Sequence, residues 1–354
     1  MTAVRPSETP LEQSPFDALP DGTVDAVVIG GGAAGLNGAL MLVRSRRSVV
    51  VIDAGTPRNA PADAVHGLLA LDGTPPAALL GRGRAEVRRY GARVITSEVV
   101  TAAPAAPVDG DPRFSVGLAG GRALSARRLL ITTGARDVLP DIPGPAAHWG
   151  HGVVHCPYCH GWEVRDEPIG ILATGTASVH QALLFRQLSD DLVVFACGTD
   201  LDAETRERLD ARGVPVFDAP VTEVLADEDG GLAGVRLADG DIVARRVLAV
   251  ATTLEPRITG LGGLGLPVED LPQGMGRRIV SGPAGTTAVP GVWVAGNVTE
   301  PTAQVGASAA AGALAGAHLN AHLVTADTDA ALARARVVRP RPHRPAQDRA
   351  PVGR

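Results

Sequence analysis

Lysine is absent from this chain of 354 residues, so all 33 basic residues are arginines, which indicates a coding bias rather than a functional choice. Aromatic residues make up only 3%, and small aliphatic side chains must therefore fill the hydrophobic cores. The net charge of −5 lacks the basic excess of nucleic-acid-binding or membrane-surface proteins. No apolar run is long enough to span a membrane, and residues 1–22 lack the pattern of a signal peptide. We therefore expect a cytoplasmic protein that binds neither nucleic acid nor membrane.

Cysteine is also scarce, and three residues in so long a chain exclude a disulfide-stabilised scaffold. Cys197 stands alone in the apolar segment LVVFAC and is expected to be a buried core thiol. Cys156 and Cys159 are instead paired in the segment HCPYCHGWE. In a reducing cytoplasm, such a pair is more often catalytic or metal-binding than structural.

The length suits two domains. Residues 1–22 are rich in Pro, Ser and acidic residues, and residues 329–354 are rich in Pro and Arg. We expect both terminal segments to be disordered. Between them, short apolar strands alternate with amphipathic or Ala-rich helical stretches, which is typical of α/β layers with parallel sheets. A strand–turn–helix unit begins near residue 24, and a second follows the cysteine pair. We predict an α/β fold of two Rossmann-like dinucleotide-binding domains. The second domain (138–253) is expected to be inserted in the first (23–137 and 254–328).

The first glycine turn carries the strongest binding signal. Gly30, Gly32 and Gly35 follow an apolar strand and open a helix, and Asp53 ends the next strand. The first glycine makes the tight turn, the second lets the backbone approach a pyrophosphate, and the third lets helix and sheet pack closely. The helix N-terminus favours the phosphate charge, and the acid can accept hydrogen bonds from a ribose. The motif therefore predicts a dinucleotide site but does not by itself distinguish FAD from NAD.

The second strand–turn–helix unit departs from this pattern. Its turn, from Ala173 to Ser178, has alanine where the first glycine of the motif belongs. No arginine pair follows the next strand, and Asp200 and Asp202 there would repel a 2′-phosphate. We expect a nucleotide fold that does not bind NADPH.

Several chemistries can use the C-x-x-C pair. Zinc needs two further ligands, and His160, directly after Cys159, is badly placed to chelate the same ion. A structural disulfide would close too short a loop to gain much chain entropy. C-x-x-C-H is also a haem-attachment pattern, but the dinucleotide context makes haem a poor fit. Redox cycling of Cys156 and Cys159, with no metal, is the favoured interpretation.

The chain resembles the low-molecular-weight thioredoxin reductase family over about residues 22–325. Four features carry this resemblance: the glycine motif, the segment TTGARDVLPDIPG, the C-x-x-C at the head of an inserted nucleotide-fold domain, and the late segment GVWVAGNV. Within this family, CPYCHGWE and RNAPADAVHGLLALDG look most like the dithiol oxidases that close disulfides in natural products such as gliotoxin, holomycin and romidepsin. The chain departs from the reductases in having His160 in place of an aspartate and Asn297 in place of a late acidic residue. Dithiol oxidases share that histidine and the eroded pyridine-nucleotide site, and they use oxygen as acceptor.

The resemblance implies FAD as cofactor, a small-molecule dithiol as substrate, O2 as electron acceptor and a homodimer. It places Cys159 nearest the flavin. We expect the substrate dithiol to attack Cys156. His160 is the candidate general base, because an imidazole titrates near neutrality, or else a residue that positions the substrate, and His155 is a second candidate base. Tyr158 and Trp162 are expected to pack or to shape the pocket, and Glu163 either orients an imidazole or lies on the surface. The residues expected to hold or adjoin the cofactor are Gly30, Gly32, Ala33, Ala34, Gly35, Asp53, Ala54, Asn59, His66, Thr133, Gly134, Gly296, Asn297, Gln304 and Val305. Of these, Gly134 is expected to end a strand.

Two other functions stay open. One is an NADPH- or ferredoxin-dependent reductase of the thioredoxin reductase type that acts on a protein disulfide. The other is a non-catalytic flavoprotein that serves as a redox sensor.

Overall fold

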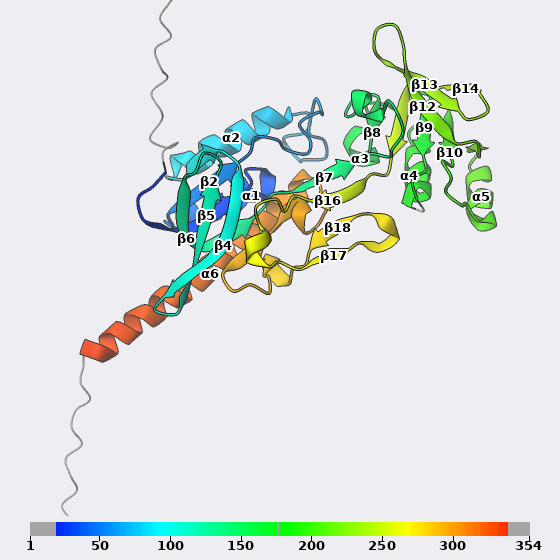
Figure 1. Cartoon of the computed structure of the whole chain (residues 1–354). Coiled ribbons are helices and arrows are strands. Elements are labelled where there is room, and N and C mark those ends of the chain that lie inside the picture. The colour runs from blue at the N-terminus through cyan, green and yellow to red at the C-terminus, as the bar shows by residue number, and fades with distance from the viewer. Residues whose placement is uncertain (1–18, 176, 339–354) are drawn as a thin grey trace, which may run out of the picture.

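A computed structural model describes residues 19–175 and 177–338 and contains two layered units, joined by two strands that lie side by side (Figure 1). The connecting strands β7 and β16 pair antiparallel. The strands within these described residues are β1 (Thr23–Ile29), β2 (Val49–Asp53), β3 (Arg93–Thr96), β4 (Val99–Val108), β5 (Asp111–Leu118), β6 (Ala123–Ile131), β7 (Ala135–Val138), β8 (Val153–Val154), β9 (Ile169–Leu172), β10 (Leu192–Phe195), β11 (Val216–Phe217), β12 (Val221–Ala226), β13 (Leu232–Leu237), β14 (Ile242–Ala244), β15 (Val247–Val250), β16 (Thr253–Pro256), β17 (Val268–Asp270), β18 (Arg277–Ile279) and β19 (Val292–Val294). The α-helices are α1 (Ala33–Arg44), α2 (Pro76–Arg89), α3 (Pro157–His160), α4 (Ala177–Phe185), α5 (Ala203–Asp210) and α6 (Val305–Val338).

The first unit is built on a parallel sheet in the order β3-β2-β1-β6, to which β19 adds along the second half of β6. The first half of the same edge of β6 pairs antiparallel with β5, which pairs with β4. Strands β1 and β2 are almost continuously apolar because a parallel sheet is covered on both faces. Each parallel strand ends at the same edge, and the loops after β1, β2 and β6 meet there.

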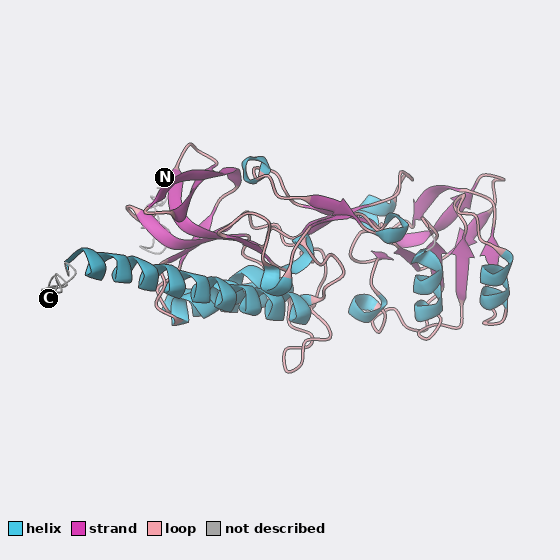
Figure 2. Ribbon diagram, turned by 90° about the horizontal axis from the view of Figure 1, so that it is seen from below, coloured by secondary structure: helices cyan, strands magenta, loops and turns pink. Residues whose placement is uncertain are grey.

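Helices α1 and α6 pack closely on one face of the first sheet (Figure 2). Glycines permit this approach: a Cβ on Gly312 would lie 2.0 Å from the carbonyl oxygen of Ala34, and one on Gly316 would lie 2.5 Å from that of Gly38. The Asn37 Nδ2 also donates a hydrogen bond to the carbonyl of Ala309. Because α6 packs directly on α1, its N-terminus is held beside the glycine turn that opens α1.

The second unit repeats this plan within the stretch of chain between β6 and β19. Its parallel sheet has the order β11-β10-β9-β15-β8, and an antiparallel meander β12-β13-β14 corresponds to the β4-β5-β6 meander of the first unit. Its core contains the fully buried Ile169, Ile171 and Phe185. The predicted α/β fold with two Rossmann-like domains is confirmed.

Two local expectations were wrong. Residues 329–338, expected to be disordered, continue helix α6, which ends at Val338. The sequence there is rich in alanine, the best helix former, and Asp327 anchors the helix by ion pairs to Arg47 and Arg127. Strand β6 stops at Ile131, so Gly134 does not end a strand but lies in the following loop with φ of +74°. The expected disorder of residues 1–18 and 339–354 concerns parts of the chain outside those described.

None of the helices within the described residues has the length and apolar character needed to cross a membrane.

Candidate active site

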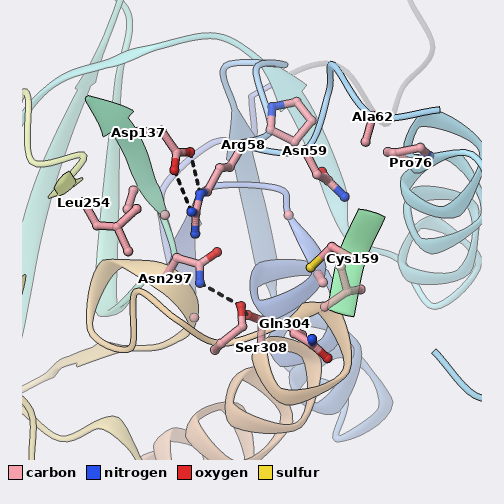
Figure 3. A pocket seen from close by; sticks show the side chains of 18 of the residues that line it. Arg58, Asn59, Ala62, Pro76, Asp137, Cys159, Leu254, Asn297, Gln304 and Ser308 are labelled. Atoms are coloured by element: carbon pink, nitrogen blue, oxygen red, sulfur yellow. Dashed lines mark hydrogen bonds and ion pairs between the residues drawn. The ribbon is translucent and has the colours of Figure 1, made fainter. Parts of the chain in front are cut away.

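A cavity of about 810 Å³ extends from the glycine turn of the first unit to the cysteine pair of the second (Figure 3). It lies at the edge where the parallel strands of the first sheet end. Every site residue predicted from the sequence lines this cavity except Gly35. Residues from distant segments of the chain are thus brought together, including Asn59, Cys159, Asn297 and Gln304 (Figure 3).

The glycine turn has the geometry of a dinucleotide cradle. Gly30 has φ of +108°, and a Cβ there would lie 2.3 Å from the carbonyl oxygen of Thr132. A Cβ on Gly35 would lie 1.9 Å from the carbonyl oxygen of Gly30, so this position needs glycine for close packing behind the cavity. Gly32 caps helix α1, and a Cβ there would meet no atom within 4 Å, which leaves its backbone open to a ligand.

Gly31 is a requirement that the motif did not reveal. A Cβ at this position would lie 2.7 Å from the Asp53 carboxylate. Because Gly31 has no side chain, the Asp53 carboxylate at the end of β2 can pack against the glycine turn. The run of three glycines from position 30 was the signal in the sequence, but its meaning depended on a partner more than twenty residues away.

The site fits a bound dinucleotide on two further observations. Asp53 accepts only a long hydrogen bond, 3.3 Å, from the Gly55 amide and lies 3.8 Å from Arg84, which leaves acceptor capacity on the carboxylate. The Thr133 hydroxyl is buried in the cavity wall and has no hydrogen-bond partner. Buried polar atoms are rarely left without partners, so this hydroxyl indicates space for a polar group of a ligand.

Asn297 has a structural task that sequence reasoning missed. It lies in the short 3-10 helix η5 (Gly296–Val298), and its Nδ2 donates to the carbonyls of Glu300, Pro301 and Ala303 at 3.1, 3.0 and 2.8 Å. The side-chain amide thus shapes the loop that leads into α6. Only its oxygen is left for a ligand, and the expectation that Asn297 contacts the cofactor stays a prediction.

An ion pair in the cavity wall, between the partly buried Arg58 and the buried carboxylate of Asp137, was also missed. Arg58 donates from Nε and Nη2 to the two carboxylate oxygens of Asp137, both at 2.7 Å (Figure 3). Its Nη1 donates to the carbonyl of Pro301 at 2.9 Å. Thr252 donates its hydroxyl to the same carboxylate at 2.6 Å. Burial alone would raise the pKa of Asp137, but the hydrogen bonds and charge of Arg58 outweigh burial and lower it.

Cys156 caps the N-terminus of helix α3 and Cys159 lies within it, and the two form a disulfide with Cα atoms 5.2 Å apart. His155, directly before the pair, has its Nδ1 2.9 Å from the carbonyl of Val250. A proton on Nδ1 donated to that carbonyl leaves Nε2 as the acceptor nitrogen. Burial lowers the pKa of His155, so the imidazole is neutral at pH 7.

His160 has an imidazole with no partner. Both ring nitrogens are buried without a hydrogen bond, and the residue lines the cavity with the cysteines. Burial lowers the pKa of His160, the negative charge of Glu163 opposes this shift, and the proximity of His66 adds to it. The result is a neutral imidazole with free nitrogens, which is the state a general base requires.

His66 was expected near the cofactor, and the structure places it at the mouth of the cavity. Its Nδ1 lies 3.4 Å from Asp72, and its Nε2 lies 3.4 Å from Glu163, which follows the cysteine pair. This imidazole therefore links the loop after β2 to the turn that follows α3.

The nucleotide turn of the second unit is closed by its own side chains. The Thr174 amide donates to the Ser178 hydroxyl at 3.1 Å, and the Thr174 hydroxyl donates to the carbonyl of Ala251 at 2.6 Å. Asp202 caps helix α5 by accepting from the Thr205 amide at 2.8 Å. A phosphate would have to compete with the hydroxyl for the turn amide and approach a carboxylate.

No group of three or more His, Cys, Asp or Glu side chains within residues 19–175 and 177–338 is arranged to hold a metal ion.

Comparison with known proteins places the chain among oxidoreductases. A family model described as pyridine nucleotide-disulphide oxidoreductase matches residues 24–316. Thioredoxin reductase tcpT of Claviceps purpurea (strain 20.1) is 34% identical over 288 residues, which cover 77% of this chain and 86% of that protein. The solved structure of HlmI is 46% identical, with a TM-score of 0.84, and the match covers 90% of this chain and 99% of HlmI. The structure of an oxidoreductase from Agrobacterium tumefaciens is 33% identical, with a TM-score of 0.79, and that match covers 86% of this chain and 99% of the other. The resemblance to thioredoxin reductase-like proteins is thereby confirmed.

Proposed function

Because the chain belongs to the pyridine nucleotide-disulphide oxidoreductase family, we propose that it is an FAD-dependent dithiol oxidase that closes an intramolecular disulfide in a small-molecule dithiol. The overall reaction converts a dithiol and O2 into a cyclic disulfide and H2O2. The observation that carries the proposal is the unpartnered, neutral imidazole of His160 beside the cysteine pair, within the cavity that contains the dinucleotide cradle.

The thiol steps follow from the disulfide and this imidazole. His160 accepts the proton of one substrate thiol, and the thiolate attacks Cys156. The bond between the two cysteines breaks, Cys159 leaves as a thiolate, and a mixed disulfide forms. The second substrate thiol loses its proton to solvent, and its thiolate attacks the substrate sulfur of that mixed disulfide. Cys156 then leaves, the substrate is oxidised, and the enzyme pair is reduced by two electrons.

FAD would be held by the turn from Gly30 to Gly32 and by Asp53, and when bound it supplies the chemistry that passes the electron pair from the enzyme dithiol to O2. The chain provides the cradle for this cofactor and a cavity that contains both Cys159 and the cradle residues.

The alternative is an NADPH-dependent disulfide reductase, which the name of the tcpT relative favours. The closed turn at Thr174 and the carboxylate of Asp202 argue against it. The non-catalytic sensor has no support of its own from the site, since a sensor does not need the free imidazole of His160.

Oxygen consumption separates these functions. Purified FAD-loaded protein is given dithiothreitol in air, with and without NADPH, while O2 uptake and H2O2 are measured. We expect equimolar O2 loss and H2O2 formation that do not depend on NADPH. Rapid anaerobic reduction of the flavin by NADPH would instead identify a reductase, and no turnover with any dithiol would leave the sensor. A Cys159→Ser variant is the control, since it should retain FAD and lose dithiol oxidation.

A further inference from the structure

A second cavity, of about 340 Å³ and here called the outer cavity, adjoins the larger cavity that contains the cysteine pair. Its lining residues are His66, Gly67, Asp72, Tyr158, Trp162 and Glu163. His66 and Tyr158 also line the larger cavity, so the two spaces adjoin at these side chains. Tyr158 lies between Cys156 and Cys159 in the sequence, so the wall shared by the two cavities includes a residue of the segment that carries the disulfide.

Two exposed aromatic rings form the walls of this outer cavity. Tyr158 is 68% exposed and Trp162 is 67% exposed, in a chain with only 3% aromatic residues. By contrast, Trp293 is only 3% exposed. Exposed aromatic rings that line one cavity are typical of a surface that a ligand covers.

The indole of Trp162 is held in place by Arg165. The guanidinium of Arg165 lies over one face of the ring, 4.2 Å from its centroid, and Arg165 Nη1 donates to the Trp162 carbonyl at 2.6 Å. This contact occupies one face and restrains the ring. A ligand in the cavity would therefore meet a pre-positioned aromatic surface, which lowers the entropy cost of binding.

The polar rim of the cavity is acidic. Asp72 accepts a hydrogen bond from the Gly67 amide at 2.8 Å, and this bond lowers the pKa of its carboxyl, so the side chain is ionised at neutral pH. Glu163 lies on the opposite side of His66 from Asp72. Two carboxylates at the rim disfavour anionic thiols and suit neutral molecules that carry N–H or O–H donors.

We propose that the outer cavity is the recognition site for the ring system of the substrate, and that it selects neutral aromatic or fused-ring dithiols by stacking on Trp162 and Tyr158. This inference rests on the proposed dithiol oxidase function. It adds a substrate class and two residues that determine specificity, while the thiols themselves reach Cys156.

Two dithiols that close the same ring size make the test. 1,2-Benzenedimethanethiol and dithiothreitol both give six-membered cyclic disulfides, but only the first carries an aromatic ring. We expect the ratio of their kcat/KM values, aromatic over aliphatic, to fall about tenfold in Trp162→Ala. Trp162→Phe should recover most of the ratio. Tyr90→Ala, at an exposed aromatic residue that follows α2 and lines neither cavity, is the matched control and should leave the ratio unchanged.

Binding gives a readout that does not need turnover. The cyclic disulfide of 1,2-benzenedimethanethiol is titrated calorimetrically into FAD-loaded wild type and Trp162→Ala, and we expect about tenfold weaker binding to the variant. If wild type and Trp162→Ala bind the cyclic disulfide equally well, the proposed recognition site is wrong. The same holds if wild type oxidises both dithiols and the variant has the same kcat/KM ratio as wild type. Either result leaves the oxidase function standing. If wild type oxidises neither dithiol, the oxidase function fails, and the titration alone decides whether the cavity binds the ring.

Discussion

At the scale of single residues, the proposed chemistry depends on the protonation of His160. Because burial lowers the pKa of this imidazole below its ordinary value of about 6.5, the base form persists into mildly acidic solution. The acidic limb of kcat/KM for dithiothreitol should therefore lie below pH 6.5. Replacement by asparagine removes the base, and we expect His160→Asn to lower kcat/KM about 100-fold and to abolish this limb. Oxygen uptake measured between pH 5 and pH 8 checks both effects.

Glu163 allows a second test of the pKa of His160, because its carboxylate acts on that imidazole. Its carboxylate raises the pKa of His160, opposing burial, so Glu163→Gln should move the acidic limb to lower pH. A limb that moves upward, or one that persists unchanged in His160→Asn, would assign the titration to another group.

Local motifs made some of these residues predictable and left others invisible. Cys156 and Cys159 stand close together in the sequence, and their spacing already indicates redox chemistry. Arg58 and Asp137 are 79 residues apart, and Thr252 is 115 residues from Asp137, so no pattern in the chain links them. Their partnership arises only where the loops after β2 and β15 meet strand β7. Sequence reasoning therefore found the reactive groups but not the buried charges that surround them.

At the scale of elements, Gly32 and Gly35 in the turn and first residues of α1 have different roles, although they belong to one motif. A Cβ on Gly35 would overlap the carbonyl oxygen of Gly30 at 1.9 Å, whereas a Cβ on Gly32 meets nothing in the protein. We expect Gly35→Ala to lower the free energy of unfolding of the FAD-free protein by about 2 kcal/mol or more, because the helix must move from the strand. Gly32→Ala should leave that stability within about 0.5 kcal/mol and weaken FAD binding.

Urea unfolding of the FAD-free proteins and flavin titration separate these outcomes. Equal FAD affinity in Gly32→Ala and wild type would mean that the cofactor does not approach this part of the backbone. A Gly35→Ala protein as stable as wild type would show that α1 can shift at no cost.

Helix α6 shows why element boundaries were harder to predict than element types. Its Ala-rich first half indicated a helix, but the Arg-rich end suggested a disordered tail. In the structure, Asp327 pairs with Arg47 beyond α1 and with Arg127 on β6, so the distant half of the helix is anchored by partners some 280 and 200 residues away. Tertiary ion pairs of this kind leave no trace in local composition.

At the scale of the whole molecule, one buried ion pair joins the two units. Arg58 belongs to the first unit, Asp137 lies on the connecting strand β7, and Thr252 follows β15 of the second unit. The carbonyl of Pro301 ties the same guanidinium to the loop before α6. The cysteine pair and the glycine turn face one cavity partly because these four segments share a single charge cluster.

Arg58→Leu should therefore destabilise the molecule by about 3 kcal/mol at pH 7, because it leaves the Asp137 carboxylate buried without its cation. The pKa of Asp137, lowered in wild type, would rise once burial is no longer outweighed by Arg58. In wild type, the lowered pKa of Asp137 means that its carboxylate stabilises the fold at pH values above its pKa in the unfolded chain. This stabilisation is lost as the pH falls through the pKa of the folded state. In the variant, protonation relieves the buried charge, so the stability difference between the two proteins should shrink as the pH falls from 7 towards 4.

Urea unfolding at pH 7 and pH 4.5 measures this difference. Arg208→Leu is the control, since Arg208 pairs with Glu204 on an exposed face of α5 and should change stability by less than about 0.5 kcal/mol at either pH. An Arg58→Leu protein as stable as the control, or a deficit that grows in acid, would mean that Asp137 is not a buried charge dependent on Arg58. The pairing of β7 with β16 and contacts such as that of His66 with Glu163 would then hold the units together without help from this ion pair.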